Sequence, residues 1–306
     1  MTAIIREYRK DPHGIMDTVV LGVRKLHESQ TIFDKGDVSE NLSINGHTVA
    51  VYSPEFPLFI KEAPYVGEGY GATHDFGTVL GFDERCLVRL DHLELILIGL
   101  AQRISSLSRD KEVAHYLRQS YVYGGMDLTR DTATGRLLLT HEIFPNIRRE
   151  VYAAREYSAA RRRCQSCDIT TERKNLGYPV LLQKGIFRAY SPFSAADVYT
   201  VEIFPSEHVT VLDQIEAADQ QDLAMILYDA SEYIYRKARE HREADSINFA
   251  VHSVPKNFDR AEDSIHMRVI VSLAEKIDKE GPFDIPFAGL RVVNERPDEI
   301  TRRLKS

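Results

Sequence analysis

The pattern of apolar positions predicts two long amphipathic helices, one in each half of the chain. The first begins at Asp91, and the second spans residues 216–239. The apolar residues that recur at three- and four-residue spacing are Leu93, Ile96, Leu97, Leu100, Ile104 and Leu107 in the first helix, and Leu223, Ile226, Leu227 and Ile234 in the second. This spacing gathers them on one face of a helix, which indicates that each helix packs against a core through that face.

Short apolar or alternating segments around the helices predict β-strands. They cover residues 48–52, 76–82, 121–123, 137–140, 187–190, 198–204, 247–251 and 265–273. The polar stretch 125–136 is predicted to be a loop that forms either a rebuilt site or a solvated turn. The order strand, strand, long helix, strand, strand then appears twice. This repetition indicates a duplication and an α+β fold with mainly antiparallel sheet.

Composition and charge limit the class of protein. The 306 residues are 43% hydrophobic and 28% charged, as in a soluble globular protein of one or two domains. The formal net charge of -7 argues against general nucleic-acid affinity, and the run Arg161–Arg163 is expected to be a solvated face or linker. No segment reaches the roughly 20 apolar residues of a membrane span, and the N-terminus lacks a signal-peptide core. We therefore expect a cytoplasmic protein with no membrane partner.

Two of the three cysteines lie three positions apart, as Cys164-Gln-Ser-Cys167. A C-x-x-C segment directs both thiolates to one point, as half of a tetrahedral zinc site requires. A redox pair and two incidental cysteines are the alternatives that the spacing leaves open. Cys86 stands alone and is expected to be a buried structural thiol.

Several short motifs along the chain carry a resemblance to a known family. They are R-E-Y-R-K-D-P-H-G at 6–14, Y-V-Y-G-G at 121–125, C-Q-S-C-D at 164–168, R-A-Y-S-P-F at 188–193, F-P-S-E-H at 204–208, and N-F-A-V-H-S-V-P at 248–255 followed by His266. In this order the chain resembles the galactose-1-phosphate uridylyltransferase family of the histidine-triad superfamily. The resemblance implies two fused histidine-triad-like domains, residues 1–155 and 156–306, each with one long helix. It also implies a homodimer and a nucleotide or nucleotide-sugar ligand.

The chain departs from this family at the catalytic motif. Members transfer a nucleoside monophosphate through a nucleotidyl-histidine, and the histidine lies in a G-x-S-x-x-H-P-H-x-Q motif. A gapless comparison places Ala133-Thr134-Gly135 where H-P-H should stand. His141 is the one replacement candidate, and its plainer interpretation is a histidine at a strand end. The inherited mechanism is therefore expected to be lost or replaced.

The resemblance also implies metal ligands, because some relatives hold one zinc in each half by C-x-x-C and two histidines. The first half has no cysteine pair at the matching positions. The second half retains the four matching residues Cys164, Cys167, His208 and His266. Four protein ligands leave no open position, so the resemblance implies one structural Zn²⁺ per chain. The alternative is that His208 or His266 merely completes hydrogen bonds in the core.

Two functions remain open at this point. The first is an enzyme, or another nucleotide- or sugar-phosphate-binding protein, on the nucleotidyltransferase scaffold. The second is a catalytically inactive binding, regulatory or assembly protein. Arg188, Lys256 and Arg268 are candidates for binding a phosphate, and His252 is expected to line a cleft or to cap a strand.

Overall fold

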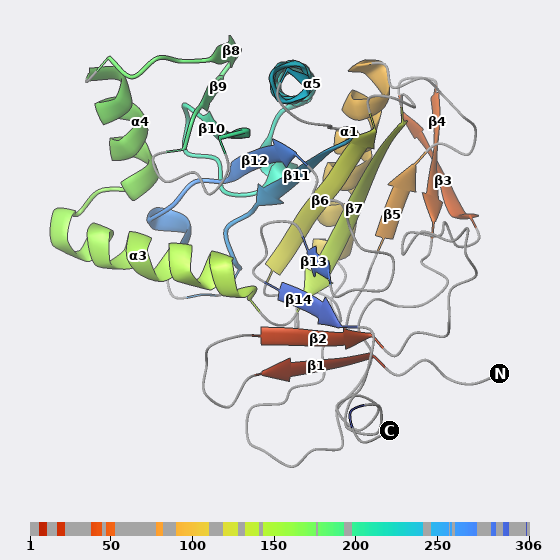
Figure 1. Cartoon of the computed structure of the whole chain (residues 1–306). Coiled ribbons are helices and arrows are strands. Elements are labelled where there is room, and N and C mark those ends of the chain that lie inside the picture. The colour runs from red at the N-terminus through yellow and green to blue at the C-terminus, as the bar shows by residue number, and fades with distance from the viewer. Residues whose placement is uncertain are drawn as a thin grey trace.

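The structure is a computed structural model of the 306-residue chain (Figure 1). The residues that it describes are 6–10, 17–21, 38–44, 47–52, 78–81, 90–109, 119–127, 132–140, 143–175, 177–192, 198–240, 246–256, 258, 261–273, 283–285, 290–293 and 304.

One antiparallel sheet runs through the molecule and contains strands from both halves of the chain. Its ten strands lie in the order β3 (Val38–Ile44), β4 (His47–Tyr52), β5 (Thr78–Gly81), β7 (Thr132–Thr140), β6 (Gln119–Asp127), β11 (Ser246–His252), β12 (Arg268–Leu273), β10 (Thr200–Pro205), β9 (Phe187–Tyr190) and β8 (Leu182–Lys184). Every neighbouring pair is antiparallel, which confirms the predicted α+β class.

The strand order is the same in the two halves when each is counted from the middle of the sheet. On one side of the β6–β11 contact the order is β6, β7, β5, β4, β3, and on the other it is β11, β12, β10, β9, β8. This correspondence agrees with the repeated order of elements that the sequence indicates. The division into two domains stays a prediction, and its boundary at residue 155 falls within helix α3 (Pro145–Arg161).

The two predicted long helices are present and share one face of the sheet. Helix α1 (Leu90–Arg109) packs on β7, helix α5 (Ala217–Arg239) packs on β8 and β12, and the two helices contact each other (Figure 1). Their apolar faces meet the odd-numbered residues of β11 and β12, such as Phe249 and Val271, in one buried cluster. Burying these side chains is the main driving force for the fold.

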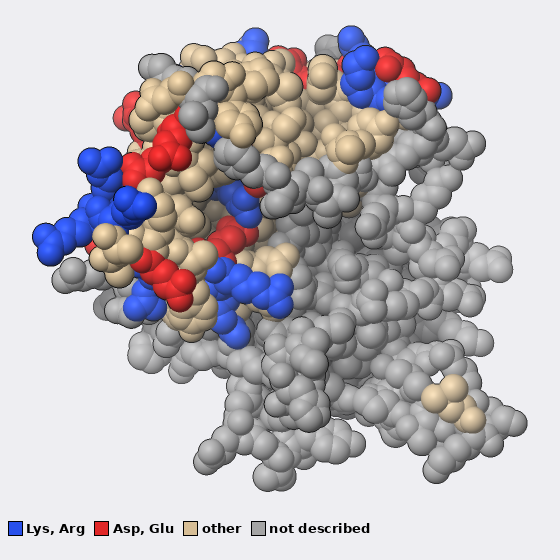
Figure 2. All heavy atoms as spheres, turned by 60° about the vertical axis from the view of Figure 1, so that its left-hand side comes forward, with Lys and Arg blue, Asp and Glu red and all other residues tan. Residues whose placement is uncertain are grey.

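Two further helices, which the periodicity does not predict, lie at the β11–β8 end of the sheet (Figure 1). Helix α3 buries only Ile147, Val151 and Ala154, and helix α4 (Gln165–Asn175) is almost entirely polar in composition. So few apolar positions give no clear helical period, which is why both were missed. The predicted solvated run Arg161–Arg163 is exposed at the end of α3. Figure 2 shows Lys, Arg, Asp and Glu side chains lying close together on the surface of the described part of the chain.

The predicted loop at 125–136 is wrong for most of its length. Residues 125–127 belong to β6 and residues 132–136 to β7, and the two strands pair from Gln119↔Thr140 to Asp127↔Thr132. β6 also pairs with β11 through residues 121–127, and β7 pairs with β5 at residues 135–137, so backbone pairing outweighs the glycines of this segment. The predicted strand 265–273 begins at Arg268, which leaves His266 in the preceding turn.

A second, four-stranded sheet brings together segments from near the two ends of the chain. Its order is β1 (Arg6–Lys10), β2 (Asp17–Leu21), β14 (Leu290–Val293) and β13 (Phe283–Ile285), with β14 parallel to β2. Two 3-10 turns, η1 (Leu212–Gln214) and η2 (Ala261–Asp263), complete the described elements. None of the described helices combines the length and apolar character that a bilayer crossing requires.

Candidate metal centre and the adjoining ion-pair network

The four predicted metal ligands come from three separate segments that converge beside α4. Cys164 immediately precedes α4 and Cys167 lies in its first turn. His208 follows β10, and His266 precedes β12. The structure therefore brings together residues that are up to 102 positions apart in the sequence.

The ligand atoms of these residues lie close enough together for one metal ion to draw all four into its coordination shell. All four lie within 4.8 Å of one another, with Cys167 Sγ 3.0 Å from His266 Nε2 and 3.9 Å from His208 Nδ1. Bond lengths of about 2.3 Å to sulfur and 2.0 Å to nitrogen give tetrahedral edges of roughly 3.3–3.8 Å. The two imidazole rings lie 4.5 Å apart at 84°, so they approach the same point from different directions. This donor set can hold a metal ion.

Backbone hydrogen bonds hold the three segments together without help from an ion. The Gln165 N–H donates to the Ser264 carbonyl at 3.1 Å, and the His266 N–H donates to Ser166 Oγ at 3.1 Å. The Met267 N–H donates to the Val209 carbonyl at 2.7 Å, which joins the two histidine segments. The site is therefore largely preformed, which lowers the cost of ordering it when an ion binds.

Burial sets the protonation of two of the ligands. It is the main factor that lowers the pKa of His266 to about 4, and His208 lowers it further, so the imidazole is neutral near pH 7. Burial, followed by the neighbouring Cys164, raises the pKa of the Cys167 thiol to about 11. An incoming ion finds a neutral imidazole and must displace the thiol proton. Within the described part of the chain, no other group of three or more metal-binding side chains meets in this way.

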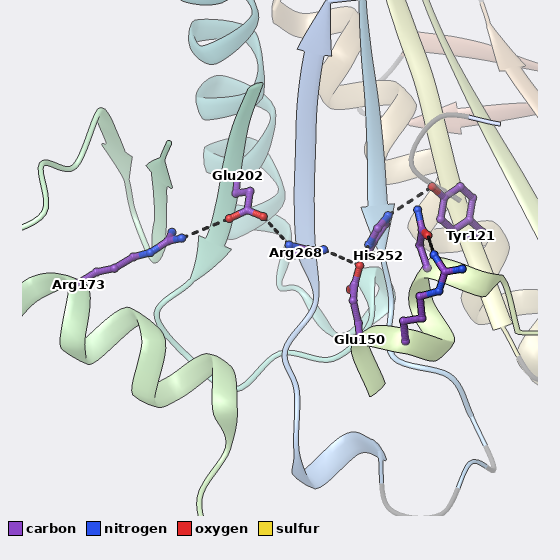
Figure 3. A network of polar contacts seen from close by, with 8 residues as sticks. Tyr121, Glu150, Arg173, Glu202, His252 and Arg268 are labelled. Carbon is purple, nitrogen blue, oxygen red and sulfur yellow. Dashed lines mark hydrogen bonds and ion pairs between the residues drawn. The ribbon is translucent and has the colours of Figure 1, made fainter. Parts of the chain in front are cut away.

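A row of polar side chains crosses the sheet next to this cluster. Register places Tyr121 on β6, His252 on β11 and Arg268 on β12 directly opposite one another. All three point away from α1 and α5, toward α3, which contributes Glu150 (Figure 3). The row is one contiguous network and extends to Glu202 on β10 and Arg173 on α4.

His252 and Arg268 share the carboxylate of Glu150. His252 Nδ1 lies 2.9 Å from Glu150 Oε1, and Arg268 Nη2 donates to the same oxygen at 2.5 Å. On the other side of His252, the Tyr121 hydroxyl lies 3.4 Å from Nε2. The Nδ1–H of His252 donates to the carboxylate, and the second ring nitrogen faces the tyrosine hydroxyl. His252 is buried, and it links β11 to α3 through its contact with Glu150.

The second carboxylate, Glu202, lies between the two arginines of the network. Arg268 Nη1 donates to Glu202 Oε1 at 2.5 Å, and Arg173 Nη2 donates to Oε2 at 3.4 Å. The Arg173 guanidinium also stacks on the rings of Tyr190, at 4.8 Å, and Phe204, at 5.5 Å. Arg173 thus fastens the polar helix α4 to the sheet through both charge and stacking.

At Glu150, the two neighbouring groups lower the pKa of the carboxyl by more than burial raises it. Burial alone would raise the pKa of this carboxyl, but His252 and Arg268 together lower it to about 2. Burial also raises the pKa of the Tyr121 hydroxyl well above its ordinary value, with a smaller contribution from Glu150. At neutral pH the network therefore contains an ionised Glu150 and a neutral Tyr121.

The other predicted site residues are not gathered at one point. Arg268 is already paired with two carboxylates, and Lys256 Nζ donates to Ser108 Oγ on α1 at 2.9 Å. Arg188 is half-buried on β9, and His141 lies outside the described residues. A small pocket lined partly by Glu150, His252, Ser253 and His266 adjoins both the network and the metal cluster. The catalytic role of His141 and the phosphate-binding roles of Arg188, Lys256 and Arg268 stay predictions.

Sequence comparison gives no family assignment for the chain. No family model matches it, and no curated protein sequence matches it.

Solved structures, in contrast, share its fold. A uridylyltransferase structure has a TM-score of 0.67 at 15% identity, and the match covers 98% of this chain and 97% of that one. An ADP-glucose phosphorylase from Arabidopsis thaliana with bound ADP-glucose has a TM-score of 0.62 at 12% identity, covering 98% and 99%. A GalT-like protein from the same plant has a TM-score of 0.59 at 13% identity, covering 84% and 83%. The uridylyltransferase-like fold expected from the motifs is confirmed, and at these identities the likeness concerns the fold alone.

Proposed function

We propose that this chain binds a nucleotide or sugar phosphate on a uridylyltransferase-like scaffold and that the inherited nucleotidyl-histidine mechanism is lost or replaced. The observation that carries the first part is the end-to-end likeness to structures that include one with bound ADP-glucose. Any activity that remains belongs to the nucleotidyltransferase or phosphoester hydrolase class.

The surroundings of Gly135 support the loss of the mechanism. In the gapless comparison, this glycine stands where the second histidine of H-P-H should be. A Cβ atom at this position would lie 2.4 Å from Ile96 Cγ2 and 2.9 Å from Leu100 Cδ1 of helix α1. A histidine side chain there would require Ile96 and Leu100 to move from their present positions.

We further propose that Cys164, Cys167, His208 and His266 bind one structural Zn²⁺. Two thiolates and two imidazoles suit zinc by softness and by tetrahedral preference. When bound, the ion would supply a cross-link between α4 and the turns that contain His208 and His266. The pKa of His266, lowered to about 4, keeps this ligand unprotonated under ordinary conditions.

A thermal-shift series tests the binding proposal. ADP-glucose, UDP-glucose, AMP, UMP and glucose 1-phosphate would each be added to the zinc-loaded chain, with the free sugars as matched controls. A ligand at 100 times its Kd stabilises the native state by about 2.7 kcal/mol and raises the melting temperature. We expect a shift with at least one nucleotide or nucleotide sugar. No shift with any phosphorylated ligand at millimolar concentration would contradict the proposal.

The alternative is a catalytically inactive binding, regulatory or assembly protein on the same fold. The pairing of Arg268 with Glu150 and Glu202 favours it, because this arginine's charge is already balanced within the protein. A homodimer and a cytoplasmic location belong to the same proposal. Sedimentation equilibrium and fractionation of tagged cells test these two points separately.

A further inference from the structure

The metal cluster and the ion-pair network share three elements. Each element supplies a ligand to the cluster and, two to six positions away, a charged residue to the network. These pairs are Cys167 and Arg173 on α4, His208 and Glu202 at β10, and His266 and Arg268 at β12. Both sets of contacts therefore hold α4 against the sheet.

The two cysteines are the part of this arrangement that an oxidant can modify. Cys164 and Cys167 are free thiols and are both partly accessible to solvent, whereas His266 is only 2% exposed. Their sulfur atoms lie within 4.8 Å of each other. The Cys164 carbonyl accepts the first helical hydrogen bond, from the Asp168 N–H at 3.1 Å, so the dithiol sits at the N-terminus of α4. Disulfide-exchanging C-x-x-C pairs occupy this position in a helix.

We propose that Cys164 and Cys167 are an oxidation site for hydroperoxides, and that forming the disulfide between them releases the bound metal ion and loosens α4. This inference rests on the metal site proposed above. It adds regulation to a site that would otherwise be a permanent cross-link.

The reaction balances with a hydroperoxide as the oxidant. One thiolate attacks the outer peroxide oxygen, the O–O bond breaks, and the leaving alkoxide takes a proton to become the alcohol. The resulting sulfenic acid is attacked by the second thiolate, which forms the S–S bond and releases hydroxide, which takes a proton to become water. Two thiolates are oxidised by two electrons and one peroxide is reduced. The ion loses two of its four ligands and passes to solvent.

Loss of the ion has a defined structural consequence. Arg173 remains stacked between Tyr190 and Phe204, so α4 keeps this contact with the sheet after the cluster opens. The first turn of α4 and the turn containing His208, which is itself exposed, lose the ion that joins them. Backbone amides at 165–168 and 207–210 should then exchange with solvent faster, while those of α5 keep their protection.

The experiment uses the full-length, zinc-loaded chain. Metal content is first measured by mass spectrometry. Hydrogen peroxide is then titrated while a chromogenic chelator reports free zinc, peptide mapping locates the disulfide, and hydrogen exchange follows α4. Cys86→Ser is the matched control, because it removes the third cysteine and leaves the C-x-x-C pair intact.

We expect one zinc to be released per disulfide formed, a loss of about 2 Da in the peptide containing Cys164 and Cys167, and recovery after reductant and zinc are added. Cys86→Ser should behave in the same way. Zinc that stays bound while methionines oxidise, or release without a Cys164–Cys167 disulfide, would overturn this inference and leave the metal site standing. A chain that takes up less than half an equivalent of zinc in its reduced state would overturn the metal site itself.

Discussion

Replacing Glu150 by glutamine removes the charge that joins α3 to the sheet and keeps the side chain's size. The wild-type carboxylate faces His252 Nδ1 at 2.9 Å and Arg268 Nη2 at 2.5 Å. An amide at this position cannot form a charge-assisted pair with Arg268. The arginine would retain Glu202 alone, in a setting where its own side chain is only 22% exposed.

The size of the effect follows from the pKa of Glu150. The two partners lower this pKa from 4.5 to about 2, in spite of burial. A difference of about 2.5 pKa units corresponds to roughly 3 kcal/mol in favour of the ionised, folded form. Removing one partner from a buried ion pair costs a similar amount, about 3–5 kcal/mol. We therefore expect Glu150→Gln to lower the free energy of unfolding by about 3 kcal/mol at pH 7.

The pH dependence separates this mechanism from a general packing defect. Because the folded-state pKa of Glu150 lies below the unfolded-state value, its contribution is complete above about pH 5 and is lost as pH falls toward 2. Roughly 2 kcal/mol of it should be gone at pH 3. The difference between wild type and Glu150→Gln should therefore shrink over this interval, because the protonated wild-type carboxyl is also uncharged.

Urea unfolding at pH 7, 5, 4 and 3 provides the assay, with Glu156→Gln as the control. Glu156 lies on the same helix but is exposed, so its loss should change stability by less than about 0.5 kcal/mol at every pH. A Glu150→Gln cost below 1 kcal/mol at pH 7, or a cost that stays constant down to pH 3, would refute the reasoning.

Three further predictions follow from the same contacts. Cys167→Ser removes a metal ligand, so we expect it to abolish zinc binding and the stabilisation that zinc gives, about 5 °C in melting temperature at 100 times the wild-type Kd; retained equimolar zinc would contradict this. Gly135→Ala pushes a methyl group into Ile96 and Leu100 and should cost about 1–3 kcal/mol in urea unfolding. Gly125→Ala, whose Cβ would approach no atom closer than 3.3 Å, is the control and should cost less, so equal costs would refute the steric argument. Tyr121→Phe removes the 3.4 Å contact between the hydroxyl and His252 Nε2 and should cost less than about 1.5 kcal/mol in urea unfolding, so a larger loss would contradict a minor role for this contact.

The sequence was most informative where one periodic signal or one spacing determines the structure. The apolar stripes located α1 and α5, because burying one face requires apolar residues every three or four positions. The C-x-x-C spacing, combined with the family resemblance, selected two histidines that the fold then brings to the same point. Local geometry and recurring motifs can be read directly from a sequence.

The ion-pair network could not be found in this way. Glu150 lies on α3, whose single narrow apolar stripe gives little periodic signal. The row Tyr121, His252 and Arg268 depends on the register of three strands, and a shift of one residue would turn each side chain to the other face. The β6–β7 hairpin could not be predicted for a related reason, since its glycine- and threonine-containing segment forms two strands that pair with each other and with β11 and β5. Such features depend on tertiary neighbours.

Equilibrium dialysis with radiolabelled UDP-glucose and ADP-glucose, followed by denaturation of the protein at neutral pH, tests the central claim most directly. It measures bound nucleotide before denaturation and covalently attached nucleotide after it. We predict saturable binding of at least one of the two ligands and no label on the denatured chain. A stable protein-bound nucleotide would contradict the loss of the inherited mechanism, and the absence of binding before denaturation would contradict the nucleotide-binding function.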